Sequence, residues 1–149
     1  MIEKDRLAEN AAVVGAHLRS RLDGLAEKHP LVGEVRGMGL KQGVELVKDR
    51  QTKEPAPQAA AAVLESARDH GLIIGKGGLY GNVLRISPPL TVTTEDADQA
   101  ADVLDKAFTE GGRGQPAASP RDVARPEDAF AGDSEGKTTP QKVVDMTAE

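Results

Sequence analysis

The sequence predicts an α+β domain, with a small and mainly antiparallel sheet, helices packed on one face of it, a long N-terminal helix and a disordered C-terminal tail. Three observations predict this class. Apolar residues recur at helical spacing in separate segments, two short apolar runs flank a glycine cluster at residues 75–81, and the composition changes after Glu110. Grouped helices joined to strands with short links are typical of this architecture.

The first helix is predicted from about Glu3 to Lys28. Its apolar residues recur in steps of three and four, which makes one face of an amphipathic helix. His29 and Pro30 end it, because the residue before a proline avoids the helical region. The residues on the apolar face are Leu7, Ala11, Val14, Leu18, Leu22 and Leu25.

Glycines recur along the next segment, residues 31–47. They indicate positions where the backbone adopts a special geometry, such as a bulge, or where another segment approaches closely. We expect a short strand near Val35, a glycine bend, and a second strand from about Leu40 to Val47. Arg36, in the bend, is interpreted as a structural hydrogen-bonding residue.

Two more helices follow. The charged, proline-containing residues 48–58 predict a loop, and a small-residue face predicts a helix over residues 58–70 that stops before Gly71. The last helix should start at Thr93 or Thr94, where a hydroxyl can cap it and acidic residues follow in the first turn, and it should run to about Glu110.

The runs Leu72–Ile74 and Val83–Ile86 are predicted to be antiparallel strands joined through the glycine cluster. Side chains alternate across a strand, so Arg85 should point to the face opposite Leu84 and Ile86. Arg85 can be interpreted in two ways. It is either a surface arginine on an edge strand or a group that captures a carboxylate through two parallel hydrogen bonds.

Composition excludes several classes of function. The chain has 149 residues, no cysteine, a net charge of −5 and 2% aromatic residues, which argues against a disulfide framework, a thiolate metal site and a nucleic-acid partner. The histidines lack ligand spacing, so no metal is expected. The glycine cluster fits no phosphate-binding motif. Without an apolar run of membrane-spanning length, a cytoplasmic protein is expected.

Residues 111–149 are rich in Gly, Pro, Ser and Asp and show no apolar periodicity. Such a segment buries too little apolar surface to offset its ordering entropy, so we expect it to be disordered.

Three segments resemble the C-terminal small domain of class III pyridoxal-phosphate aminotransferases, of the ornithine, 4-aminobutyrate and alanine–glyoxylate type. The resemblance covers about residues 2–108, and its most specific parts are VRGMGL and NVLRISPPL. It implies a fold-type I enzyme, usually a homodimer, that transfers an amino group from an amino acid or amine to a 2-oxo acid. In that family the arginine that matches Arg85 binds the substrate carboxylate.

The resemblance also implies that pyridoxal 5'-phosphate is bound by a large domain that has no counterpart in these 149 residues. We therefore expect residues 1–30 to be a helix linking to that missing domain, residues 31–110 to be the small domain and residues 111–149 to be a tail. No catalytic, cofactor-binding or metal-binding residue is predicted, and the isolated chain should be inactive. The alternative is a stand-alone module that reuses the fold to bind a ligand or to dimerise.

Overall fold

The computed structural model describes residues 6–113, which form three helices and five strands. The elements follow one another in this order: α1 (Leu7–Lys28), β1 (Val32–Met38), β2 (Lys41–Asp49), β3 (Glu54–Pro55), α2 (Pro57–Asp69), β4 (Gly75–Gly77), β5 (Val83–Ile86) and α3 (Thr94–Gly112).

The sheet is antiparallel and has the strand order β1-β2-β5-β4, with the short β3 paired to β2 outside this path. Strands β2 and β5 are therefore central. Their register sets Gly43 opposite Arg85 and Val44 opposite Leu84. On the other side of β5, Gly75 lies opposite Arg85.

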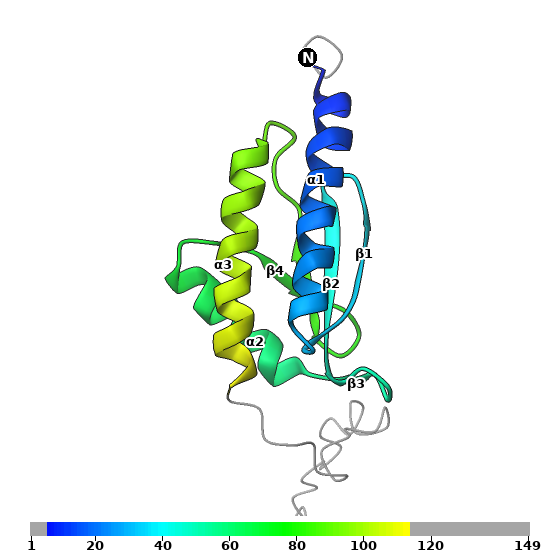
Figure 1. Cartoon of the computed structure of the whole chain (residues 1–149), viewed down its shortest axis with the longest axis vertical. Coiled ribbons are helices and arrows are strands. Elements are labelled where there is room, and N and C mark those ends of the chain that lie inside the picture. Colours follow the sequence, from blue (N-terminus) through cyan, green and yellow to red (C-terminus); the bar gives the residue numbers. More distant parts are fainter. Residues whose placement is uncertain (1–5, 114–149) are drawn as a thin grey trace, which may run out of the picture. The chain divides into compact units, whose positions relative to one another are not determined.

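All three helices contact one face of the sheet or each other, and α1 and α3 lie side by side (Figure 1). The α+β class predicted from the sequence is confirmed. The core between helices and sheet is built from aliphatic side chains and Phe108, as expected for a chain with so few aromatic residues. Its most deeply buried large side chains include Leu18, Leu22, Leu46, Leu84, Leu104 and Phe108.

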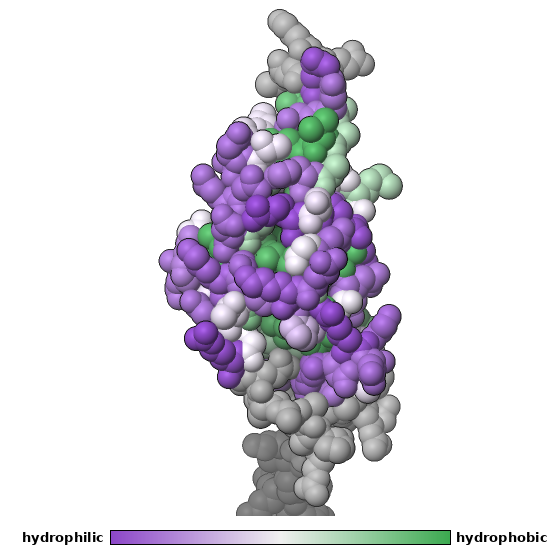
Figure 2. Space-filling model, in the orientation of Figure 1, coloured by the Kyte–Doolittle hydropathy of each residue, from purple (hydrophilic) through white to green (hydrophobic). Residues whose placement is uncertain are grey.

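The outer surface of the helices is mostly hydrophilic, with hydrophobic residues visible near the N-terminal end of α1 and in a hollow near the middle (Figure 2). Among the described residues, the large apolar side chains left exposed include Val13, Met38, Ile73 and Leu79. Within residues 6–113, no helix combines the length and the hydrophobicity that crossing a membrane requires.

Helix α1 packs tightly against the turn between β1 and β2. A Cβ added at Gly15 would lie 2.4 Å from the carbonyl carbon of Gly39, so α1 and this turn approach backbone to backbone. Gly39 has φ +54°, a left-handed conformation that favours glycine. The glycine bend predicted between the first two strands is confirmed at Gly39, whereas the close approach of Gly15 was not predicted.

One strand was placed wrongly from the sequence. Leu72–Ile74 is not a strand, and the strand that pairs with β5 is Gly75–Gly77 inside the predicted glycine connection. Leu72 and Ile74 pack against the core, while Ile73 is 87% exposed. The apolar run therefore serves packing, and the glycines form the sheet edge because they leave space for a neighbouring side chain.

The helix ends within the described residues agree well with the prediction, and the expected start of the first helix at about Glu3 lies outside them. Thr93 caps α3, and its hydroxyl and the Asp96 carboxylate form a reciprocal capping box. This box lowers the pKa of Asp96 below its usual value. Helix α3 continues to Gly112, slightly past the expected end at Glu110. The rest of the predicted tail, residues 114–149, lies outside the described residues.

A polar cluster joins α1, α3 and the loop after β2. Asp105 of α3 lies 2.6 Å from Lys28 Nζ and 2.5 Å from His29 Nε2. Arg50 donates to the carbonyl oxygens of Ala26, His29 and Val32 and so satisfies carbonyls where α1 ends. Lys28, and after it His29, hold the pKa of the Asp105 carboxyl below its usual value of 3.8.

The lowered pKa predicts an acid dependence of stability. The unfolded chain takes up the Asp105 proton at a higher pH than the folded chain. The stability that Asp105 contributes is therefore fully present above its usual pKa and is lost as pH falls through the lowered pKa. Asp105→Asn should destabilise the protein at neutral pH and weaken its acid dependence, measured by denaturant unfolding at a series of pH values. The control Asp102→Asn removes only an exposed pair with Arg21 and should change the free energy of unfolding by less than about 0.5 kcal/mol. If the Asp105→Asn variant lost stability in acid as the parent does, Asp105 would not be the source of this pH dependence.

Candidate functional site

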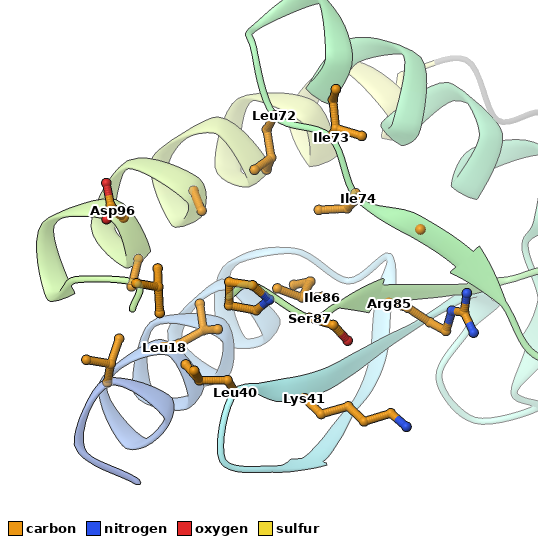
Figure 3. Close-up of a pocket in the computed structure, with 16 residues that line it drawn as sticks. Leu18, Leu40, Lys41, Leu72, Ile73, Ile74, Arg85, Ile86, Ser87 and Asp96 are labelled. Carbon is orange, nitrogen blue, oxygen red and sulfur yellow. The ribbon is translucent and has the colours of Figure 1, made fainter. Parts of the chain in front are cut away.

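A groove of about 540 Å³ lies where the segment before β4 diverges from the end of β5. Leu18, Leu40, Leu72, Ile74 and Ile86 give it apolar walls (Figure 3). Its charged lining side chains lie at two separate ends. Lys41 and Arg85 are at one end and Asp96 is at the other. The groove thus offers an apolar surface with a cationic mouth.

Arg85 lies on β5 and is exposed on the sheet face opposite the core, as the alternation of side chains predicted. Its neighbours in the register are glycines on both sides, Gly43 of β2 and Gly75 of β4. A central strand bordered by glycines leaves the side chain room to lie over the sheet. Arg85 is consequently held on a rigid element and still reaches solvent.

The glycines of β4 lie directly beneath the Arg85 side chain. A Cβ added at Gly77 would lie 3.0 Å from Cδ and 3.3 Å from Nε of Arg85, and one added at Gly75 would lie 3.6 Å from Nε. Neither glycine has a positive φ, so the backbone alone does not require glycine at these positions. Their lack of a side chain gives Arg85 its place.

The nearest carboxylates on the same sheet face are engaged elsewhere. Glu45 is two residues along β2 from Gly43, and it lies 2.7 Å from Arg36 Nη1. Arg36 also contacts Glu34 at 2.8 Å, and these partners, Glu45 first, raise the pKa of Arg36 above its usual value. The hydrogen-bonding role predicted for Arg36 is therefore confirmed, although Arg36 lies in β1 rather than in the bend. Within residues 6–113, Arg85 has neither a hydrogen bond nor an ion pair from its side chain.

Sequence reasoning found Arg85 but missed the residues around it. Gly43 was interpreted as backbone geometry, and Gly75 and Gly77 as a flexible hairpin connection. Gly43 and Gly75 instead pair with Arg85, and Gly77 lies beside its side chain. The spacing of Gly75 and Gly77, two residues apart, was the available signal, because residues two apart on a strand share one face. Lys41 and Ser87 line the same groove and were not predicted to do so.

Comparison with known proteins places the chain in a family. The family model "Aminotransferase class-III" matches residues 1–108. The chain belongs to the class III aminotransferases. It is 47% identical over 109 residues to "Alanine--glyoxylate aminotransferase 2 homolog 2, mitochondrial" from Arabidopsis thaliana and 46% identical over 109 residues to "Isoleucine 2-epimerase" from Lentilactobacillus buchneri. These matches span 73% of this chain but only 23% and 24% of the relatives, so this class III chain covers about a quarter of their length.

Solved structures agree with the family. An aminotransferase from Bacillus anthracis matches with a TM-score of 0.69 and 38% identity, over 72% of this chain and 25% of that one. An omega transaminase from Pseudomonas jessenii, solved in complex with PMP, matches with a TM-score of 0.68 and 34% identity, over 75% of this chain and 24% of that one. The predicted resemblance to class III aminotransferases is confirmed, and pyridoxal phosphate is the cofactor of that family.

The described residues do not by themselves suit this cofactor. A phosphate is commonly bound at a helix N-terminus, but the N-terminus of α3 beside the groove is closed by the Thr93 cap and carries Glu95 and Asp96. These carboxylates would repel a phosphate. The lysine in the groove, Lys41, is exposed at the end of a strand rather than enclosed. The groove therefore does not suit the phosphate of the cofactor.

Proposed function

We propose that the chain is the substrate-closing small domain of a pyridoxal-phosphate-dependent class III enzyme, in which Arg85 binds the carboxylate of an amino acid or a 2-oxo acid. One observation carries the proposal: Arg85 is exposed on a central strand, borders glycines on both sides and has no ion-pair partner among residues 6–113. A planar guanidinium can bind a carboxylate through two parallel hydrogen bonds.

The reaction of the complete enzyme is amino transfer in this proposal. The aminotransferase relatives support it, and the relative named as an epimerase shows that class III sequences of similar identity also carry another activity name. The cofactor supplies the electron sink for either chemistry, and the described residues supply the carboxylate site. The chain alone should therefore bind acids but transfer no amino group.

The domain boundaries follow from the same proposal. Residues 1–30 contain the helix that links to the large domain, and residues 31–112 form the rest of the small domain, because α3 runs to Gly112 rather than ending at 110. The residues after α3 form the tail that was expected to begin at residue 111. The homodimer implied by the family resemblance stays a prediction, and so does the cytoplasmic location expected from the sequence composition.

Joining this chain to the large domain of a class III relative tests the proposed function. The joined protein should bind pyridoxal phosphate, seen by its absorbance, and should transfer the amino group of an amino acid to a 2-oxo acid, while the chain alone should do neither. Amino transfer by the chain alone would contradict the proposal. So would a folded, cofactor-loaded joined protein in which Arg85→Leu leaves the affinity for amino acids unchanged.

The glycines beneath Arg85 give a matched pair of variants in that joined protein. Gly77→Ala puts a methyl group within 3.0–3.3 Å of the Arg85 side chain and should displace it, whereas Gly75→Ala makes an ordinary contact at 3.6 Å. We expect Gly77→Ala to raise KM for carboxylate substrates roughly five- to tenfold, since about 1 kcal/mol of a charge-assisted hydrogen bond is lost. Gly75→Ala should leave KM for the same substrates close to that of the parent protein. Equal effects of the two variants would show that the glycines do not position Arg85.

A further inference from the structure

Lys41 lies on the same sheet face as Arg85. It begins β2 and precedes Gln42, which pairs with Ile86 of β5. Because side chains alternate, Lys41 and Gly43 share the face that Arg85 occupies on the next strand. Lys41, Arg85 and Ser87 line the same end of the groove (Figure 3).

Within residues 6–113 the charge of this mouth is not balanced. Neither Lys41 nor Arg85 has a side-chain hydrogen bond or ion pair there, and Glu45, the carboxylate on this face closest along β2, is bound to Arg36. Asp96 also lines the groove, but it lies at the far end and accepts hydrogen bonds from Thr93. Two cations without a partner among the described residues therefore lie on one face of the sheet, at the same end of the groove.

We propose that Lys41 is a second anion-binding residue of this site, which makes the site prefer acids with two negative charges over monocarboxylates. The proposal rests on the proposed function of Arg85. Side chains at diagonal positions of neighbouring antiparallel strands are roughly 7–8 Å apart at their base, within reach of long side chains. Arg85 can hold one carboxylate by two hydrogen bonds, and Lys41 supplies a point charge on a flexible stem for a second acidic group.

Leu40 and Ile86 also line the groove, but they alternate with Lys41 and Arg85, are each 6% exposed and face the core side of the sheet. The carbon part of such an acid therefore spans the outer face between the two cations. A dicarboxylate with a short carbon chain can place its two charges on Lys41 and Arg85. A monocarboxylate of the same length uses only one of them.

Titration of the full chain with succinate and with butyrate, at equal ionic strength and followed by NMR, tests the proposal. The two acids have equally long carbon chains and differ in one carboxylate. Succinate should bind about three- to fivefold more tightly, as expected for one added exposed ion pair. Lys41→Met should reduce the affinity for succinate to that for butyrate and leave butyrate binding unchanged.

Lys76→Met is the matched control, because it removes the same charge from β4 at a position paired with Leu84 rather than with Arg85. It should preserve the preference for succinate. The proposal is overturned if Lys41→Met keeps that preference, or if Lys76→Met abolishes it equally, which would indicate net charge rather than a site. If butyrate does not bind, or binds equally well to Arg85→Leu, the proposed carboxylate-binding role of Arg85 is refuted. The role of Lys41, which depends on it, is then refuted as well. Butyrate binding that depends on Arg85, without a succinate preference, refutes Lys41 alone.

Discussion

Gly15→Ala should destabilise the protein by about 2–3 kcal/mol, although alanine is the better helix former. The added methyl group would lie 2.4 Å and 2.5 Å from the carbonyl carbon and oxygen of Gly39. These are backbone atoms of a tight turn, which cannot rotate away as a flexible side chain can. Helix α1 and the turn between β1 and β2 would have to separate. The free energy of unfolding, from denaturant titration of the full chain, measures the effect.

The same helix supplies the control for this prediction. Gly24 has open space around an added Cβ, so Gly24→Ala should stabilise the protein by roughly 0.5–1 kcal/mol through helix propensity alone. The two glycine-to-alanine substitutions in one helix should change the free energy of unfolding in opposite directions, because only Gly15 contacts another backbone segment. If both variants were stabilised, α1 would not lie against Gly39 as described.

Arg85→Lys, in the enzyme completed with a large domain, should weaken carboxylate substrates by about 1.5–3 kcal/mol, which is roughly 10- to 150-fold in kcat/KM. Lysine keeps the charge but cannot form the two parallel hydrogen bonds. It also lacks the Nε and Nη2 atoms with which Arg85 approaches Gly75. Steady-state kinetics with an amino acid and with a simple amine measures the difference.

The amine serves as the internal control for Arg85→Lys, because it has no carboxylate to lose. Its kcat/KM should stay within about twofold, which corresponds to less than 0.5 kcal/mol. An equal loss for the amine and the amino acid would mean that Arg85 supports the structure of the site or the domain closure. The carboxylate role would then be wrong.

Helical periodicity predicted most of this fold because it is a local signal. The apolar face of α1 and the cap of α3 at Thr93 could be predicted from residues three and four apart, and the structure confirms both. The first strand of the predicted hairpin could not be placed this way. Leu72–Ile74 has the composition of a strand, but its packing against the helices draws it away from β5 and leaves the pairing to Gly75–Gly77.

The candidate site was predicted only in part for a related reason. Arg85 was visible as a charge that interrupts an apolar strand, and its outward direction followed from alternation. Its glycine neighbours and Lys41 come to it through strand register, which joins residues about 10 to 40 positions apart and which the sequence does not display. Arg50, which binds carbonyls at the end of α1, was hidden in a segment read only as a charged loop.

The central claim is that this chain is one part of a longer class III enzyme, and the DNA directly upstream of the Met1 codon tests it most directly. The account predicts a reading frame for a pyridoxal-phosphate-binding large domain there, continuous with this one or separated from it by a single frameshift. Finding no such frame would contradict the account, and a stand-alone binding or dimerisation module would replace it.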